Sequence, residues 1–194
     1  MITAVILTKN ESQLISKCID SLLFCSEILV IDDFSSDDTI GQIQKLKIKN
    51  KNYNDKIKIV QRKLEGNFGD QRNYGLELAK NNWVLFIDAD EFVSEPLASE
   101  IQSVISEQSQ KYAGYLIKRD DIFLGEKLKY GETAGIWLLR LGQKTSGKWI
   151  GRVHEQWKME GKIGKLYSPL MHHSHQEITS FLAKINHYSD LVEL

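Results

Sequence analysis

The sequence predicts an α/β fold with a mostly parallel central sheet, and two observations indicate it. Short apolar runs alternate with segments of helical periodicity along most of the chain, as in doubly wound sheets. The run Trp83–Ile87 is apolar without interruption and β-prone, which is typical of a central strand covered on both faces. At 194 residues the chain is long enough for one well-buried domain and short for two, so we expect a single domain over residues 1–194.

Strands are expected where the apolar runs stop at polar residues. In the first half of the chain these are Ile2–Leu7, Ile28–Ile31, Ile57–Val60 and Trp83–Ile87. Two later segments alternate between apolar and polar residues and are also expected to be strands, Tyr112–Arg119 and Gly135–Leu141. The early strands predict the parallel sheet, and the later ones predict a smaller, mixed β region.

Helices are expected between the strands. Glu11–Phe24 repeats apolar residues at helical spacing. Asp37 and Asp38 precede a second helix, Thr39–Ile48, where their charges suit the N-terminus. The remaining expected helices are Gln71–Lys80, Pro96–Gln108 and Ile178–Leu194. The polar face of the last helix is not notably basic, so we expect it to cover the domain rather than to lie on a membrane.

Composition argues against several classes of protein. Charged residues make up 26% of the chain and the net charge is −1, so no overall basic field favours nucleic-acid binding. No apolar run approaches the ~20 residues of a membrane span, and we see no signal-peptide pattern at the N-terminus. Cys18 and Cys25 are too few for a disulfide framework, which favours a reducing, cytoplasmic location.

Carboxylates directly follow the buried run Trp83–Ile87, in the tetrad Asp88-Ala89-Asp90-Glu91. If the backbone stays extended, Asp88 and Asp90 face the same side, and they repel each other unless a cation lies between them. Mg²⁺ or Mn²⁺ suits such oxygen ligands and commonly also binds substrate phosphates. The alternative is an acidic, solvated turn after a strand, and the tetrad alone does not separate the two.

Two further strands also end at polar residues. Ile28–Ile31 runs into an acidic stretch over residues 32–39, and Ile2–Leu7 ends at Thr8-Lys9-Asn10-Glu11. In an open α/β sheet, ligands bind outside the carboxyl ends of the strands. Three polar strand ends within the first ninety residues therefore predict one shared site.

These motifs together resemble glycosyltransferase family 2, a large family of inverting enzymes with the GT-A fold. The matching stretches, in order, are Val5–Glu11, Val30–Thr39, Arg72–Leu76 and Phe86–Glu91. The resemblance implies a GT-A fold in which residues 1–95 form the nucleotide-sugar-binding half and residues 96–194 the acceptor-side half. Later segments resemble a narrower branch of lipopolysaccharide-core glycosyltransferases, including enzymes that add glucose; these are Arg140-Leu141, Gly151–Glu155 and His172–Ser189.

The resemblance places a group of residues around the nucleotide sugar: Thr8, Asn10, Glu11, Asp33, Arg72 and Asp88. Asp33 is expected to accept a hydrogen bond from N3–H of uracil, a charge-assisted bond that a base without that donor cannot make. Thr8 and Asn10 could instead only cap strand ends. Arg72 is expected to reach the diphosphate or to brace the aspartates, and as a lone arginine it could also be a surface ion pair.

The resemblance also implies a divalent cation, Mn²⁺ or Mg²⁺. Asp90 is expected to bind it directly, and Asp88 to bridge to the ribose or to a bound water. His172 is the expected late histidine ligand, with His173 and His175 as alternatives, and an imidazole would favour Mn²⁺. Glu91 is expected to support these ligands or merely to cap a helix.

An inverting transfer needs a general base to deprotonate the acceptor hydroxyl. Members of the family often carry a Glu-Asp pair well after the metal motif, and this chain lacks it. Glu155 is the expected substitute, with His154 orienting it, contacting phosphate or acting as the base itself. Trp149 and Trp157 could wall off the site and stack on sugar rings. Alternatively, both tryptophans belong to the core face of a strand and Glu155 is exposed.

The expected activity is therefore a metal-dependent transfer of a hexose, glucose from UDP-glucose, with inversion. The expected partners are a UDP-hexose donor and a glycan or lipid-linked saccharide acceptor, with the lipopolysaccharide inner core as the acceptor and a peripheral contact at the inner membrane face. Two alternatives remain. A nucleotidyltransferase would need a Gly-rich, basic loop after the first strand, and Thr8–Glu11 is not such a loop. A catalytically inactive nucleotide-sugar-binding domain would account for the missing Glu-Asp pair.

Overall fold

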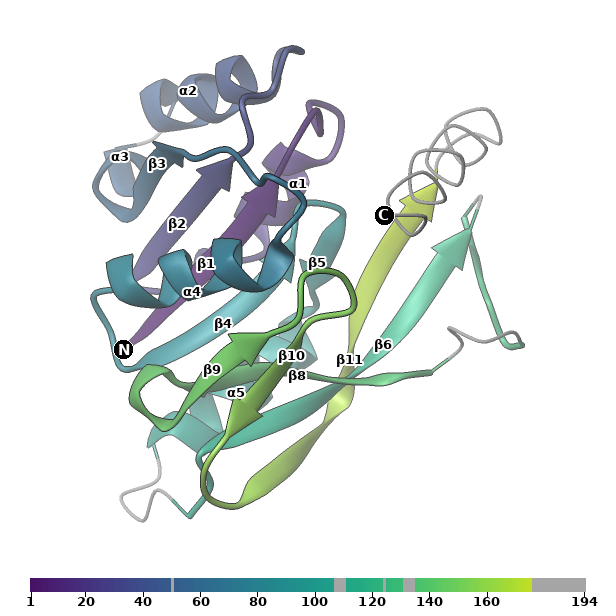
Figure 1. The fold of residues 1–194 in the computed structure, drawn as a ribbon. Helices are drawn as coiled ribbons and strands as arrows, with labels where there is room; N and C mark the ends of the chain where they lie inside the picture. Colours follow the sequence, from purple (N-terminus) through teal and green to yellow (C-terminus); the bar gives the residue numbers. More distant parts are fainter. Residues whose placement is uncertain (50, 107–110, 124, 131–134, 176–194) are drawn as a thin grey trace.

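The computed structural model describes residues 1–49, 51–106, 111–123, 125–130 and 135–175 (Figure 1). The expected helix Ile178–Leu194 lies outside the described residues. The predicted parallel sheet is confirmed in the first half of the chain. The strands β1 (Ile2–Thr8), β2 (Glu27–Asp32), β3 (Ile57–Gln61) and β4 (Trp83–Asp88) are adjacent in the order β3-β2-β1-β4, and each pair is parallel.

The second half extends this sheet in mixed orientation, as the sequence predicts. The added strands are β5 (Glu91–Val93), β6 (Gly114–Phe123), β7 (Glu126–Lys127), β8 (Trp137–Gln143) and β11 (Ile163–His175). From β4 the order continues β8-β6-β11-β5, with β7 pairing β6. β8 is antiparallel to both of its neighbours, so β6 and β11 run in the same direction as β4. The carboxyl ends of β4, β6 and β11 therefore point the same way.

The helices follow the predicted alternation, with shifted bounds. They are α1 (Ile15–Asp20), α2 (Thr39–Lys49), α3 (Lys51–Lys56), α4 (Phe68–Leu78) and α5 (Glu95–Ser106), with a short 3₁₀ helix at Lys144–Ser146. α1 is shorter than expected, because residues 12–14 and 21–24 form turns. α4 begins earlier than expected, since the Asn67 side chain accepts a hydrogen bond from the Asp70 N–H and caps the helix.

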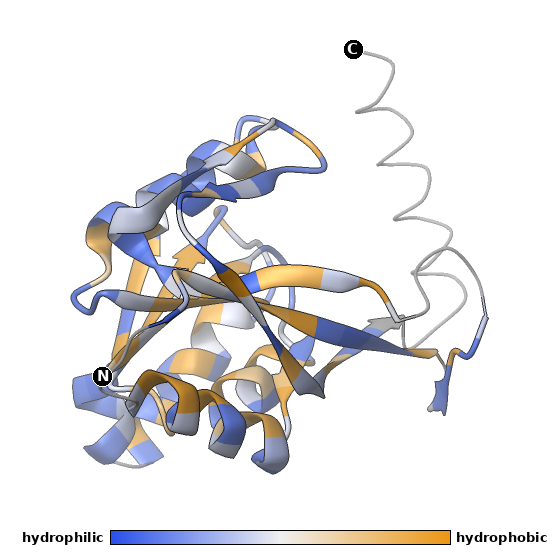
Figure 2. Cartoon of the chain, turned by 90° about the horizontal axis from the view of Figure 1, so that it is seen from below, coloured by the Kyte–Doolittle hydropathy of each residue, from blue (hydrophilic) through white to orange (hydrophobic). Residues whose placement is uncertain are grey.

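Both faces of the sheet are buried, and the strands are largely hydrophobic while the helices mix both kinds of residue (Figure 2). One core cluster joins the sheet to α1, α2 and α5, and it includes residues of β6, β8 and β11. The other joins the opposite face to α4 and to a separate hairpin of β9 (Gly147–Ile150) and β10 (Gln156–Met159). In Figure 1 this hairpin lies beside α4. The hairpin and α4 thus form one wall above the sheet.

Trp149 and Trp157 sit in this second cluster. The two rings stack with centroids 5.4 Å apart, and each meets Phe86 of β4 edge-on at 5.1 Å. Both are almost fully buried. The alternative that they belong to a core face is confirmed, and both residues also line the cleft described below, as the first expectation requires. Their packing on Phe86 helps to hold the hairpin against the sheet.

Candidate active site

A cleft of about 980 Å³ opens at the carboxyl ends of β1 and β4, between the sheet and the β9–β10 hairpin. Its lining includes most of the residues that the sequence predicts for the site: Thr8, Glu11, Asp33, Arg72, Asp88, Asp90, His154, Glu155 and His172. The predicted shared site at the strand ends is thus one continuous cavity.

Asp33 directly follows β2, lines the cleft and is nearly buried. Its backbone N–H donates to the carbonyl oxygen of Thr8, so the ends of β1 and β2 are tied together. One carboxylate oxygen accepts from the Leu64 N–H at 3.0 Å, and the other faces the Lys9 Nζ at 2.7 Å. The Lys9 side chain is 57% exposed, so it can move away when another donor approaches Asp33.

Asn10 is not among the residues that line the cleft. It has a left-handed backbone with φ of 55°, and its side-chain oxygen accepts from the Ser36 N–H. Asp32 accepts from Ser35 and from Gln61. Asp37 accepts from the N–H of Thr39, the first residue of α2, and from the N–H of Ser12 in the turn after β1. These residues brace the loops after β1 and β2, and the expected capping role of Asp37 is confirmed.

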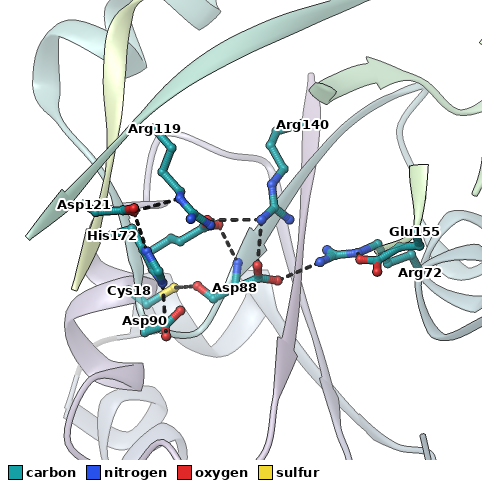
Figure 3. Close-up of polar contacts among 10 residues, drawn as sticks. Cys18, Arg72, Asp88, Asp90, Arg119, Asp121, Arg140, Glu155 and His172 are labelled. Carbon is teal, nitrogen blue, oxygen red and sulfur yellow. Dashed lines mark hydrogen bonds and ion pairs between the residues drawn. The ribbon is translucent and has the colours of Figure 1, made fainter. Parts of the chain in front are cut away.

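The acidic tetrad does not continue as a strand, and the expectation that Asp88 and Asp90 share one side of an extended backbone is wrong. β4 ends at Asp88, the chain turns at Ala89 and Asp90, and β5 starts at Glu91. The turn points the two carboxylates to different partners (Figure 3). Local sequence alternation could not reveal the turn, because Ala89 is buried and apolar like the strand before it.

Asp88 lies between two arginines. Its Oδ1 accepts from Arg72 Nη2 at 2.9 Å, and its Oδ2 accepts from Arg140 Nη2 at 2.6 Å. Burial alone would raise the pKa of Asp88, but the charges and hydrogen bonds of Arg140 and Arg72 hold it well below its usual range. Both carboxylate oxygens of Asp88 thus accept a hydrogen bond from a buried arginine, and its expected role as a bridge to the ribose or to a bound water stays a prediction.

Three contacts of helix α4 position Arg72. Arg72 is almost fully buried, and its guanidinium lies 4.8 Å from the Trp149 ring. Asn73 makes two hydrogen bonds to the backbone of Trp149 on the hairpin. A Cβ on Gly75 would lie 2.7 Å from Val5 Cγ1, so only glycine lets the helix approach β1 this closely. Of the expected roles of Arg72, bracing the aspartates is the one observed.

Glu155 and His154 lie in the loop that joins β9 to β10, and not in a strand. Glu155 Oε1 accepts from Arg72 Nε at 2.6 Å, and its side chain is 12% exposed, so the expectation of a solvent-exposed Glu155 is wrong. His154 is exposed and has a left-handed backbone with φ of 56°. The loop is also bonded to α4, since the Phe68 N–H at the start of this helix donates to the Arg152 carbonyl oxygen.

Glu91 is fully buried and links the acidic turn to Arg140 and to a further arginine, Arg119. Its Oε2 accepts from the Asp88 N–H, and its Oε1 lies 3.1 Å from Arg140 Nη2 and 3.8 Å from Arg119 Nη1. Burial raises the pKa of Glu91, and the Arg140 charge opposes that rise. Glu91 thus supports the acidic turn, which was the first of the two expectations. It does not cap a helix.

Asp90 and His172 face each other across the cleft end of β11. Asp90 Oδ2 and His172 Nε2 are 3.5 Å apart, and the other ring nitrogen, Nδ1, lies 2.7 Å from Asp121 Oδ1 (Figure 3). Two donors each about 2.1 Å from one ion stand roughly 3–3.5 Å apart at angles near 90–110°. The pair therefore fits a divalent cation as two protein ligands, and Asp88, paired with arginines, does not complete the set.

His173 points elsewhere. Its ring packs edge-on against Phe92 with centroids 4.9 Å apart, and its backbone N–H donates to the Asp90 carbonyl oxygen. This hydrogen bond fixes the acidic turn to β11. Of the three histidines proposed as metal ligands, His172 lies at the cleft and His173 does not, and the side chain of His175 lies outside the described residues. Within the described part of the chain, no three His, Cys, Asp or Glu side chains converge on one ion, so other ligands would have to complete the coordination.

Three residues of this site were missing from the sequence-based assignment of roles. They are Arg119, Arg140 and Asp121, and of these only Arg140 belongs to a stretch that resembles the narrower branch. Arg119 and Asp121 sit near the end of β6, with Arg119 Nε 2.9 Å from Asp121 Oδ1. The sequence does carry a signal for two of them. The charged cluster Arg119-Asp120-Asp121 comes late in an apolar strand, as the polar residues do at the earlier strands.

Residues 3–160 match the protein family described as "Glycosyl transferase family 2". The chain belongs to this family. Its fold agrees with that assignment, because solved structures of other proteins superpose on it. The Staphylococcus aureus TarS fragment 1–349 in complex with UDP gives a TM-score of 0.51 at 25% identity, over 62% of this chain and 36% of that chain. A mannosyltransferase from Pyrobaculum calidifontis, solved with GDP-Man and Mn²⁺, gives 0.50 at 18% identity, over 61% and 35%. The GT-A expectation is confirmed.

Curated relatives extend the comparison. The lipopolysaccharide core biosynthesis glycosyltransferase LpsC of Rhizobium meliloti is 27% identical over 98% of this chain and 69% of its own length. An uncharacterized glycosyltransferase of Rickettsia conorii is 36% identical over 60% of this chain, and the match covers only 39% of that protein. The family member described here thus corresponds to less than half of some of its relatives. Within its described residues, no helix has the length and apolar character needed to cross a membrane.

Proposed function

We propose that this family 2 member transfers a hexose from a UDP-hexose, with glucose as the sugar, to a saccharide of the lipopolysaccharide core, with inversion and with a divalent cation. The observation that carries the proposal is the pairing of Asp90 and His172 at the end of a cleft whose other end is closed by Asp33. One end suits a cation with a diphosphate, and the other suits a nucleobase. TarS, whose solved complex holds UDP, supports the nucleotide, and the LpsC likeness supports the acceptor class.

The roles of individual residues follow from their contacts. Asp33 would accept from the uracil N3–H once Lys9 moves aside, while Thr8 and Glu11 line the same part of the cleft. Asp90 and His172 would hold Mn²⁺ or Mg²⁺, which offsets the charge that develops on the departing nucleoside diphosphate. Arg72 and Arg140 each keep an Nη1 group that is buried without a hydrogen-bond partner, and these donors suit an anionic ligand.

Glu155 is the proposed general base, because it is the carboxylate of the hairpin loop that lines the cleft. It would take the proton of the acceptor hydroxyl as that oxygen attacks the anomeric carbon from the face opposite the diphosphate. Its contact with Arg72 fixes its position relative to Asp88 and the acidic turn. The exposed His154 beside it is assigned to contact with the acceptor.

The test uses the full chain with a panel of labelled UDP-hexoses and Mn²⁺, scored for hydrolysis of the donor. Slow release of hexose that is lost in Asp90→Ala supports the proposal. Conversion of a nucleoside triphosphate to a sugar nucleotide would favour a nucleotidyltransferase instead, and UDP binding without turnover of any donor would favour an inactive binding domain.

A further inference from the structure

A row of charged side chains runs from the hairpin loop to the end of β11 (Figure 3). Acidic and basic groups alternate along it, each within 4 Å of the next: Glu155, Arg72, Asp88, Arg140, Glu91, Arg119, Asp121, His172 and Asp90. Most of this row braces the acidic turn. The contact between Asp121 and His172 differs, since it joins a carboxylate that does not line the cleft to a histidine that does.

The sheet places these two residues opposite each other. β11 lies between β5 and β6, and in this register His172 pairs with Glu91 on one side and with Asp121 on the other. Asp121 is 2% exposed, and its Oδ1 is hydrogen-bonded to the His172 ring nitrogen Nδ1 at 2.7 Å and ion-paired with Arg119, whose Nε lies 2.9 Å away. Arg119 is itself next to the buried Glu91. Burial and the ion pair with Arg119 thus hold Asp121 in place beside the imidazole of His172.

The chemistry of the contact decides what it does to the ring. An ionised carboxylate only accepts hydrogen bonds, so the imidazole must donate from Nδ1–H. In the neutral ring the proton is then on Nδ1, and Nε2 carries the lone pair. Nε2 is the nitrogen that faces Asp90 at 3.5 Å. The same contact sets the rotation of the ring and makes Nε2 a stronger donor to a metal.

We propose that Asp121 is a positioning residue, which holds the ring of His172 so that the Nε2 lone pair faces Asp90 and the cleft. This inference rests on the proposed function, because a cation between Asp90 and His172 is part of it. It goes further by assigning a role to a buried residue that does not itself line the cleft.

The same strand offers a matched control. Asp120 is the neighbouring residue, is equally buried, and is ion-paired with Lys127 on the β7 side. Asp120→Asn and Asp121→Asn each replace one buried, paired carboxylate of β6 by an amide of the same size. Any general loss of folding from such a change affects both variants, whereas the orientation of His172 depends only on Asp121.

Two measurements on the full chain test the proposal. The first is the nitrogen NMR spectrum of ¹⁵N-histidine-labelled protein without metal, at a pH well above the pKa of His172, with His172→Gln used to assign its signals. We expect the wild type and Asp120→Asn to carry the proton on Nδ1, and Asp121→Asn to shift toward the other tautomer. The second is Mn²⁺ affinity with UDP present, by calorimetry or electron paramagnetic resonance.

We expect Asp121→Asn to weaken Mn²⁺ binding by about 10- to 100-fold, the usual effect of removing such a partner, and Asp120→Asn to leave it unchanged. Equal affinity in the wild type and Asp121→Asn overturns the role of Asp121 alone. A wild type that binds no Mn²⁺ overturns the proposed metal site and this inference with it. If Asp121→Asn does not fold, the wild-type spectrum still decides, because a proton on Nε2 of His172 contradicts the proposal.

Discussion

The side-chain amide of Asn73 pairs with the backbone of Trp149, accepting from its N–H and donating to its carbonyl oxygen, both at 2.9 Å. These two bonds tie α4 to the hairpin whose loop carries Glu155. Replacing Asn73 by alanine leaves both backbone groups of Trp149 without this partner. We expect the free energy of unfolding to fall by about 1–3 kcal/mol, measured by urea denaturation. Asn54→Ala, at an exposed position of α3, is the control; equal loss in both variants would contradict the pairing.

Gly75→Ala tests the close approach of α4 to the sheet. The new Cβ would lie 2.7 Å from Val5 Cγ1 and 3.1 Å from Ile31 Cδ1, so the helix must shift outward. We expect a destabilisation of about 1–3 kcal/mol from overpacking, although alanine favours a helix by about 1 kcal/mol over glycine. Thermal unfolding measures it, with Glu77→Ala on the exposed face of α4 as the comparison. A more stable Gly75→Ala protein would show that the contact is loose.

Asp88→Asn removes the charge between Arg72 and Arg140. Arg72 and Arg140 are almost fully buried, whereas the Asp88 side chain is 32% exposed and partly screened by water, so we expect a loss of about 1–3 kcal/mol at neutral pH. The folded-state pKa of Asp88 is lowered, so its contribution is fully present above the unfolded-state pKa of about 3.9 and is lost as the pH falls below it. The stability difference between wild type and Asp88→Asn should therefore be flat from neutral to mildly acidic pH and then shrink. A gap that widens on acidification would contradict this.

Both cysteines should be inert in the folded protein. They are free and fully buried, and burial raises the pKa of the Cys25 thiol to about 12 and also raises the pKa of Cys18. Since the thiolate is the reactive form, alkylation by iodoacetamide at neutral pH should be negligible without denaturant and complete in urea. Mass spectrometry of the labelled protein gives the result, and rapid native labelling of either residue would refute it.

Glu155→Gln separates the two candidates for the general base. The change preserves the shape of the side chain but removes the ability to take a proton. If Glu155 is the base, transfer should fall by about 10²–10⁴-fold, with UDP and Mn²⁺ binding retained. His154→Ala should lower transfer far less. The reverse ranking, measured as turnover of the donor that the panel identifies, would assign the base to His154.

The strand ends that line the cleft could be predicted from the sequence because they are built from local signals. Asp33 and the acidic tetrad each follow a short apolar strand, and parallel strands bring such ends to one edge of the sheet. The prediction of an extended backbone at Ala89 was wrong, since an apolar residue there gives no sign that the strand has ended.

The remaining contacts depend on strand pairing over long distances in sequence. Arg140 reaches Asp88 only because β8 pairs with β4, and Asp121 reaches His172 only because β11 runs parallel to β6. Nothing in the local pattern of residues 163–175 sets that partner or that register. For the same reason Arg119 and Arg140 resembled scattered surface charges in the sequence, whereas both lie next to buried carboxylates.

The row of alternating charges crosses the boundary between the first 95 residues and the rest. Asp88, Glu91 and Arg72 come from the earlier segment, while Arg140, Arg119 and Glu155 come from the later one. A fragment that ended after β5 would leave Glu91 without either of its arginines and Asp88 with Arg72 alone, and it would expose the β4 edge that β8 covers. Residues 1–95 therefore depend on three charged side chains of the later segment, and any fusion of this segment to another protein would have to supply them.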